Sequence, residues 1–230
     1  MNVSVAVPAY NEEKFIADCL MSLKKQTVPC EIVVCDNGST DRTYQIALKY
    51  ADKVVREPKR GVAHAFNAAS RAAVGELLAF TGADCIVPSD WIEKFLPEFS
   101  DRRVIACFGP VHSTKRKYWR TLKYYSIFHS VITRLKITWG ISDANMMVRK
   151  SVLEKVGYFD PKVQIMEDSF LVRKIRRYGK FRFLRKNIVR TSPRRFEKEG
   201  ILRIFFKYFT SLILIKVTGK AGCKRLTTVR

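Results

Sequence analysis

The first 90 residues alternate between short apolar runs and longer stretches with helical spacing. The apolar runs predict buried strands at residues 3–7, 31–35 and 77–80. Pro8 has no N–H for a sheet ladder and is expected to end the first strand. Apolar positions three and four residues apart predict helices at 16–25, 43–50 and 63–74. Strands that alternate with helices are typical of a parallel sheet with right-handed crossovers.

Each predicted strand is followed by a polar side chain suited to binding a ligand. Tyr10 and Glu12 follow the first strand, Asp36 ends the second, and Asp84 follows the third. The carboxyl ends of parallel strands meet at one edge of a sheet, where open α/β folds bind their ligands. A ring and carboxylates at that edge suit a nucleotide. The first turn is equally consistent with a plain helix start, with Asn11 as the N-cap and Glu12 in the first turn.

The second half is predicted to add a strand at 139–148, a turn at 157–161 and a helix at 170–177. Glu167 and Asp168 open that helix. Acids at a helix start often only offset the helix dipole, but two adjacent carboxyls also raise one pKa, which suits a general base near neutral pH. Arg194 and Arg195 follow a Ser-Pro turn and fit either forked contacts with phosphate oxygens or a solvated basic turn.

The net charge of +22 is concentrated in the second half of the chain. Residues 1–110 hold 13 Lys and Arg against 14 Asp and Glu, whereas residues 111–230 hold 30 against 7. An excess divided in this way marks a surface for an anionic partner, such as nucleic acid, an anionic membrane or a phosphorylated substrate.

Two basic amphipathic helices are predicted in this half, at 115–137 and 201–217. Basic faces opposite aromatic and aliphatic residues suit the membrane interface. The first helix fits membrane binding and packing against the sheet equally well, and the second favours a membrane or a partner helix. Its longest charge-free run has eight residues, far short of the ~20 that cross a bilayer. Since no zinc-finger, RRM or helix-turn-helix pattern is present, a nucleic-acid partner is not expected.

Other features limit the class of protein. A chain of 230 residues suits one domain with an appendage. Residues 1–8 lack the basic region and long apolar core of a signal peptide, and the six cysteines form no Cys-x-x-Cys pair, so reduced thiols are expected. No Gly-x-Gly-x-x-Gly follows the first strand, which disfavours a dinucleotide dehydrogenase.

In their order along the chain, these motifs resemble the family-2 inverting glycosyltransferases, which have the GT-A nucleotide-sugar fold. The resemblance spans about residues 2–196 and rests on several segments that are individually weak. They are Val-Pro-Ala-Tyr-Asn-Glu at 7–12, Asp-Asn-Gly-Ser-Thr-Asp at 36–41, 61–67, Gly-Glu at 75–76, Ala-Asp at 83–84, Gly-Tyr-Phe-Asp at 157–160 and Glu-Asp at 167–168. The implied fold is α/β, with a mixed, mostly parallel central sheet flanked by helices.

The resemblance also implies roles for individual residues. Asp36 would accept a hydrogen bond from the base, Asp84 would hold Mn²⁺ or Mg²⁺ on the diphosphate, and Asp168 would be the general base, with Glu167 beside it. The expected donor-binding residues are Pro8, Tyr10, Glu12, Asp36, Arg60, Asn67, Ala83, Arg194 and Arg195.

Two positions depart from the family pattern. Gly82 stands where the family usually has the first aspartate of Asp-x-Asp, which leaves Asp84 with fewer carboxylates beside it. Phe66 stands where many relatives have arginine, so a base or phosphate contact would fall to Arg60 or Arg71. Gly82 is also consistent with a degenerate site.

The expected protein is a hexosyltransferase. A catalytic domain at 1–196 would divide into a nucleotide-binding half (1–110) and an acceptor half (111–196), followed by a basic amphipathic helix and tail at 197–230. It would transfer a sugar with inversion from a nucleotide-diphosphate donor, UDP before GDP, to a lipid-linked or glycan acceptor. It would be cytoplasmic and peripheral on the inner face of the cell membrane. The alternative is a catalytically degenerate module that binds a nucleotide sugar or an anionic membrane.

Overall fold

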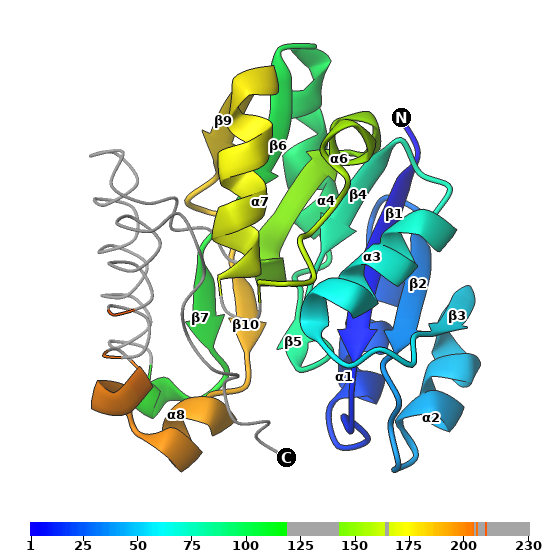
Figure 1. The fold of residues 1–230 in the computed structure, drawn as a ribbon, viewed down its shortest axis with the longest axis vertical. Helices are drawn as coiled ribbons and strands as arrows, with labels where there is room; N and C mark the ends of the chain where they lie inside the picture. Colours follow the sequence, from blue (N-terminus) through cyan, green and yellow to red (C-terminus); the bar gives the residue numbers. More distant parts are fainter. Residues whose placement is uncertain (119–142, 164–165, 205, 207–209, 211–230) are drawn as a thin grey trace.

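The computed structural model describes residues 1–118, 143–163, 166–204, 206 and 210 (Figure 1). The strands are β1 (Val3–Ala9), β2 (Glu31–Asp36), β3 (Lys53–Arg56), β4 (Leu77–Phe80), β5 (Cys85–Ile86), β6 (Val104–Phe108), β7 (Val111–Ser113), β8 (Met146–Arg149), β9 (Lys180–Phe183) and β10 (Val189–Thr191). The α-helices are α1 (Ile16–Lys24), α2 (Thr43–Tyr50), α3 (Val62–Ala72), α4 (Trp91–Phe95), α6 (Lys150–Val156), α7 (Glu167–Ile175) and α8 (Arg194–Glu199). Short 3₁₀ turns are η1 (Leu96–Ser100), η2 (Arg116–Tyr118), η3 (Asp143–Asn145) and η4 (Arg176–Tyr178).

The central sheet has seven strands in the order β3-β2-β1-β4-β8-β6-β9. Strands β1 to β4 pair in parallel, and β9 is parallel to β6, whereas β8 runs antiparallel to both of its neighbours. The predicted mixed, mostly parallel sheet is therefore confirmed. A second sheet, β5-β10-β7, lies beyond the carboxyl end of β4.

Alternate residues of the central strands supply two apolar cores, one on each face of the sheet. In β1, Val5 and Val7 pack with α1 and α4, whereas Ala6 packs with α3, α6 and α7. A parallel strand covered on both faces is apolar at almost every position, which explains why the first three runs show no regular polar alternation. Figure 1 shows the resulting three layers, helices on either side of one sheet.

The first strand is longer than predicted, because Pro8 does not end it. β1 continues to Ala9 and stays in register with β2, where Pro8 faces Cys35 and Ala9 faces Asp36. The Ala6 carbonyl accepts the Thr81 N–H, so the backbone groups of Ala6 face β4. Backbone groups two residues apart in a strand face the same side, and the N–H that Pro8 lacks would therefore also face β4. Since β4 has already ended at Phe80, no ladder hydrogen bond is lost there.

The predicted helix cap at Asn11 is also wrong. Helix α1 begins at Ile16, and Asn11 has a left-handed backbone with φ of 53°. Its side-chain oxygen instead accepts the backbone N–H of Thr40, and the backbone N–H of Glu12 donates to Thr43 Oγ1. The turn after β1 is therefore fixed to the turn after β2, not to the helix that follows it.

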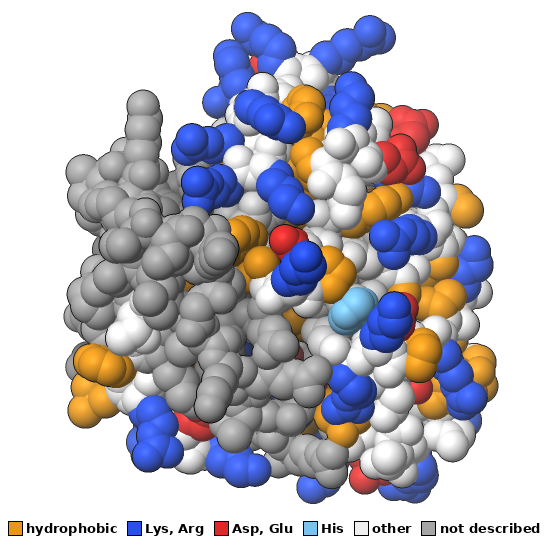
Figure 2. Space-filling view, in the orientation of Figure 1, with side chains coloured by type: hydrophobic (Ala, Val, Ile, Leu, Met, Phe, Trp, Pro, Cys, Tyr) orange, Lys and Arg blue, Asp and Glu red, His pale blue; other side chains and the backbone are white. Residues whose placement is uncertain are grey.

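Lys and Arg side chains gather at the end of the molecule shown at the top of Figure 2, over the region where Figure 1 places the upper ends of α7 and β9. From Arg173 to Lys186 the sequence has eight Lys and Arg and no Asp or Glu. Most of these side chains are exposed. Part of the charge excess of the second half therefore lies together on one surface.

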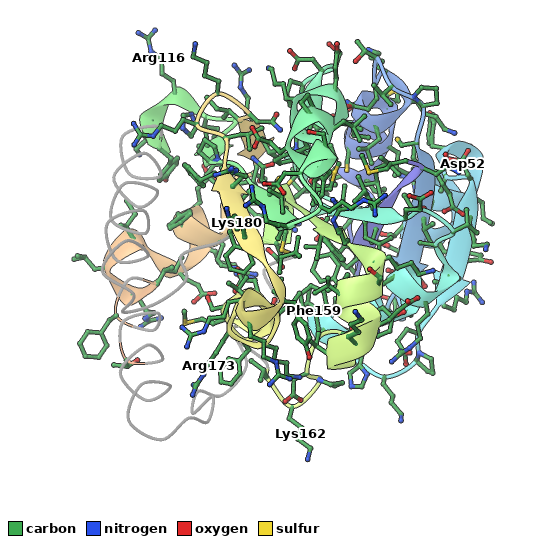
Figure 3. The ribbon with its side chains drawn as sticks, turned by 90° about the horizontal axis from the view of Figure 1, so that it is seen from above. Asp52, Arg116, Phe159, Lys162, Arg173 and Lys180 are labelled. Atoms are coloured by element: carbon green, nitrogen blue, oxygen red, sulfur yellow. The ribbon has the colours of Figure 1, made fainter. Side chains whose placement is uncertain are left out.

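An aromatic cluster ties α3 to the turn that precedes α7 (Figure 3 labels Phe159). Phe159 stacks on Phe66 with ring centroids 5.1 Å apart, and Phe80 meets both rings edge-on. The Asn67 amide donates to the Phe159 carbonyl at 2.9 Å and accepts its N–H at 3.0 Å. These contacts fix the position of Phe159 against α3.

The two predicted basic helices lie mostly outside the described residues. Within the first, only residues 115–118 are described, including η2, and of the second only 201–204, 206 and 210, all helical. In the described part of the chain, no helix has the length and apolar character needed to cross a bilayer.

Candidate active site

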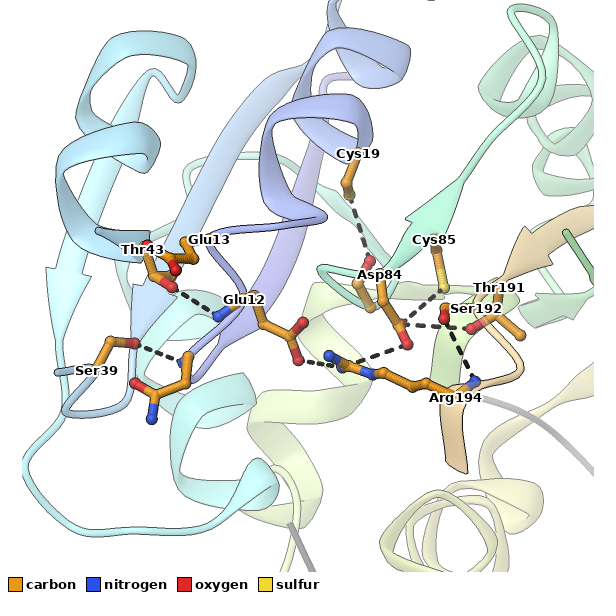
Figure 4. Close-up of polar contacts among 12 residues, drawn as sticks. Glu12, Glu13, Cys19, Ser39, Thr43, Asp84, Cys85, Thr191, Ser192 and Arg194 are labelled. Carbon is orange, nitrogen blue, oxygen red and sulfur yellow. Dashed lines mark hydrogen bonds and ion pairs between the residues drawn. The ribbon is translucent and has the colours of Figure 1, made fainter. Parts of the chain in front are cut away.

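Arg194 lies between two carboxylates that come from different strand ends (Figure 4). Its Nη2 forms a close ion pair with Glu12 Oε1 and lies 3.4 Å from Asp84 Oδ2. Its guanidinium carbon is also 4.9 Å from the ring centroid of Phe15. Glu12, Asp84 and Arg194, which the sequence predicted for one site, thus meet at the carboxyl edge of the sheet.

The small sheet brings Arg194 to this position. β10 pairs antiparallel with β5, so that Thr191 lies opposite Cys85, the residue after Asp84. The Ser192 N–H donates to the Asp84 carbonyl at 3.1 Å. Thr191 Oγ1 is 3.4 Å from Asp84 Oδ1, and the basic turn that begins α8 follows directly.

Burial makes the charges of this group costly. Burial raises the pKa of Glu12 to about 7, although the contact with Arg194 acts in the opposite direction. Glu12 Oε2 is buried and has no hydrogen-bond partner among the described residues. A carboxylate in this state favours a cation or a proton beside it.

The donor atoms suit the divalent cation that the sequence implied. Mg²⁺ and Mn²⁺ prefer oxygen ligands, and Mg²⁺ is commonly held by one or two carboxylates together with substrate phosphates. Among the described residues, no three His, Cys, Asp or Glu side chains form a group that could hold a metal. The Asp84 carboxylate is already next to a positive charge, and a cation bound with a diphosphate fits the same oxygens.

Tyr10 and Asp36, two of the residues predicted for the nucleotide, lie at the ends of β1 and β2. The Arg60 guanidinium lies over the Tyr10 ring, with its carbon 3.0 Å from the ring centroid, and Nη1 donates to the carbonyls of Asn37 and Gly38. Asp36 is buried at the end of β2, next to the same turn, and accepts the Ser39 N–H at 3.3 Å. An aromatic face and a buried carboxylate, the two features expected for base recognition, are therefore neighbours.

A second acidic group lies at the start of α7. Asp143, Glu167 and Asp168 form it, and Arg195 is the nearby cation. Burial, followed by the neighbouring charge of Asp143, raises the pKa of Asp168 to about 8. The Asp168 carboxylate also accepts the Ser169 N–H at 2.6 Å. Since Arg194 and Arg195 are consecutive, one turn supplies a cation to each acidic group.

Asp143 was not singled out from the sequence. It precedes β8, whose first residue, Met146, pairs with Phe80 at the end of β4. Because β8 runs antiparallel to β4, it begins at the sheet edge where β4 ends. The residues just before β8 therefore belong to the same edge as Asp84. The available signal was an acid just before an apolar run. It indicates a place at this sheet edge only if the strand formed by that run is known to be antiparallel to β4.

The side chains of four other residues considered from the sequence pack or bond elsewhere. Both ends of the Asn67 amide are bonded to the Phe159 backbone, and Ala83 is buried in the core, so it offers only backbone atoms. Phe66 is part of the aromatic cluster, and Arg71 lies over the Tyr158 ring at 5.0 Å. Of the two arginines considered, Arg60 is therefore the one that lies over the Tyr10 ring.

Comparison with known proteins supports the family resemblance. AglE, a glycosyltransferase of Haloferax volcanii, is 30% identical over 172 residues, which cover 68% of this chain and 55% of AglE. The Staphylococcus aureus poly(ribitol-phosphate) β-N-acetylglucosaminyltransferase TarS is 39% identical over 103 residues, 41% of this chain and 17% of TarS. The chain thus spans about half the length of AglE and a smaller part of TarS.

Solved structures share the fold over almost the whole chain. TarS residues 1–349 with UDP-GlcNAc superimpose with a TM-score of 0.69 at 22% identity, covering 97% of this chain and 68% of that one. The mannosyltransferase PcManGT of Pyrobaculum calidifontis, with GDP-Man and Mn²⁺, gives 0.68 at 25% identity, covering 96% and 66%. These likenesses confirm the predicted GT-A fold. Residues 4–157 match the description Glycosyl transferase family 2, and the chain belongs to this family.

Proposed function

We propose that this protein transfers a hexosyl group from a nucleoside-diphosphate sugar to an acceptor hydroxyl or phosphate, with inversion at the sugar C1. The observation that supports this most directly is the assembly of Glu12, Asp36 and Asp84 at one sheet edge. The acids and cations at the start of α7 and α8 complete the group.

In the donor complex, the base would stack near Tyr10 and donate a hydrogen bond to Asp36. UDP is the favoured nucleotide, as in the TarS complex, although PcManGT binds GDP-Man. Asp84 would hold the divalent cation, which when bound would stabilise the charge of the departing diphosphate. Arg194 and Arg195 are suited to forked contacts with the diphosphate oxygens.

For the acceptor, Asp168 is the proposed general base. Its raised pKa places it near neutral pH, where a carboxyl can accept a proton from a hydroxyl as the bond to C1 forms. A single in-line displacement, with no covalent enzyme intermediate, inverts the anomeric centre. If the acceptor is a phosphate, it is already ionised, and Asp168 would position it instead.

The proposed acceptor is lipid-linked, and the proposed location is the cytoplasmic membrane surface. The basic surface of the second half supports this part of the proposal, because anionic lipid attracts clustered Lys and Arg. A glycan acceptor would need no such surface.

A thermal-shift screen tests the donor part. UDP or GDP with Mn²⁺ or Mg²⁺ is expected to raise Tm, and Asp84→Ala is expected to remove the metal-dependent part of the rise. Sugar release from a labelled donor in a single turnover separates an active enzyme from a degenerate binding module. If no nucleotide raises Tm, the proposed function is wrong.

A further inference from the structure

Glu12 lies where a second acidic ligand for the cation would be expected. Gly82 leaves the usual metal motif without its first aspartate, and a Cβ at this position would lie 3.0 Å from Asp84 Oδ1. Glu12, from the end of β1, nevertheless reaches the same guanidinium nitrogen as Asp84, from the end of β4. The position of Arg194 Nη2 is therefore a point at which two carboxylates already converge on one positive charge.

The burial of this group indicates that the positive charge is required. The side chains of Glu12, Asp84 and Arg194 are only 13%, 21% and 20% exposed. In addition, Glu12 Oε2 has no hydrogen-bond partner in the described part of the chain. Two largely buried carboxylates need a counter-charge, and one guanidinium leaves them with an oxygen unsatisfied.

We propose that Glu12 and Asp84 together hold the divalent cation of the donor complex, and that Arg194 occupies this position until the donor binds. The inference rests on the proposed function and deepens it by naming the second ligand. Mg²⁺ is commonly held by one or two carboxylates and substrate phosphates, which matches Glu12, Asp84 and a diphosphate.

Charge balance explains why the exchange depends on the donor. Two carboxylates and Arg194 together carry a charge of about −1, so a divalent cation added to them alone would lie against the guanidinium. A diphosphate brings further negative charge and forked acceptors for an arginine. The cation then replaces Arg194 between the carboxylates, and Arg194 moves to the phosphate oxygens. Metal binding is consequently expected to require the nucleotide.

Titration of Mn²⁺ followed by electron paramagnetic resonance, with and without UDP, tests this exchange. The wild-type protein should bind Mn²⁺ tightly only with UDP present. Arg194→Gln should bind Mn²⁺ without UDP about tenfold or more tightly than the wild type. Adding Glu12→Gln should remove that gain as completely as adding Asp84→Asn, whereas Arg194→Lys should behave like the wild type because a cation remains.

Arg103→Gln is the matched control. Arg103 is exposed, and its guanidinium forms an ion pair with Asp101 Oδ2 at 3.0 Å. The substitution thus also removes an arginine from a carboxylate, and the variant should gain no Mn²⁺ binding. Far-UV circular dichroism and Tm establish that each variant is folded before titration.

The outcomes separate this inference from the proposed function. If the wild type binds neither UDP nor Mn²⁺ with UDP, the proposed function fails. If UDP binds but Mn²⁺ never does, Arg194 is a permanent substitute for the metal and the exchange is overturned. If Mn²⁺ binds with UDP but Glu12→Gln leaves its affinity unchanged in both backgrounds, Glu12 is not a ligand and the inference is wrong.

Discussion

At Asp168, burial and the neighbouring charge of Asp143 raise the pKa of the carboxyl, whereas hydrogen bonds with Ser169 act in the opposite direction. Its carboxyl faces Asp143 and Glu167, with Arg195 as the nearby cation and the Ser169 N–H as a donor. Burial dominates and raises the pKa from 3.8 to about 8. A group in this state changes its protonation within the range of pH in which enzymes work, so its role can be tested through pH.

The rate is expected to rise with pH. A general base has to be ionised, and with a pKa of about 8 the ionised fraction at pH 6 is roughly one hundredth of its value on the alkaline plateau. With an alcohol acceptor, kcat should therefore increase through pH 8 and then level off. Asp168→Asn should lower kcat by about a thousandfold or more and abolish the rise, while leaving the Kd for UDP unchanged. A rate independent of pH between about 6 and 9 in the wild type would contradict this role.

The same carboxyl is expected to make stability depend on pH. Because its pKa is higher in the folded protein than the ordinary 3.8, the folded state binds a proton that the unfolded state releases, and stability is lost as pH rises from about 4 to about 8. Asp168→Asn should therefore raise stability relative to the wild type at pH 8.5, by about 1 kcal/mol for a half-buried group, and give no such gain at pH 4. Tm measured across this range tests the prediction.

Asp101→Asn is a control of opposite sign. The Arg103 guanidinium lowers the pKa of Asp101 to about 2, so this substitution should give no gain in Tm at alkaline pH. If Asp168→Asn and Asp101→Asn respond to pH in the same way, the residue-level account of Asp168 is wrong.

At the scale of elements, a buried polar network fixes the start of β8 beside the site. The Asn145 amide accepts from Trp91 Nε1 at 2.8 Å and donates to the carbonyls of Pro110 and Asn187 at 2.9 and 2.7 Å. Gly109 is required next to it, because a Cβ there would lie 2.2 Å from the Asn187 carbonyl oxygen. These contacts join α4, β8 and the segments that lead into β7 and β10.

Asn145→Ala is expected to destabilise the protein by about 3 kcal/mol, because three buried groups lose a partner at once. Urea unfolding gives the free energy. Ser100→Ala, which removes one exposed local hydrogen bond to the Pro97 carbonyl, should change stability by about 0.5 kcal/mol or less. Equal effects of the two substitutions would contradict the importance assigned to the network.

The elements that could be predicted from sequence are those fixed by local periodicity. The helix at 43–50 and the strand at 77–80 agree with α2 and β4, because their apolar spacing reflects burial directly. The helix at 16–25 also agrees with α1. A cap at Asn11 was wrongly inferred because the turn after β1 is fixed by contacts with the turn after β2, which no local pattern reveals. The ion pairs of Arg194 with Glu12 and Asp84 depend on the pairing of β10 with β5. These two strands are about a hundred residues apart in the sequence, so local periodicity does not reveal their pairing.

At the scale of the whole molecule, the separation of charge is the main feature. The first half of the chain is nearly neutral and contains the strand ends proposed for the donor, whereas the second half carries the excess of Lys and Arg. Figure 3 shows the Arg173 side chain pointing outward from α7. Donor recognition and attraction to an anionic partner are thus assigned to different parts of one fold.

Membrane binding is therefore expected to depend on salt and on this surface. Each cation near an anionic bilayer contributes about 1 kcal/mol, so changing Arg173, Arg177 and Lys180 to Gln should weaken co-sedimentation with phosphatidylserine-containing vesicles by roughly a hundredfold at low salt. Changing Lys14, Lys25 and Lys49, three exposed cations of the nearly neutral half, removes the same charge and should have a much smaller effect.

Raising the salt to about 0.5 M should weaken binding of the wild type, because screening shortens the range of the attraction. Binding to neutral vesicles as strongly as to anionic ones would show that apolar contacts dominate, and salt-sensitive binding to RNA or DNA but not to vesicles would assign the basic surface to nucleic acid.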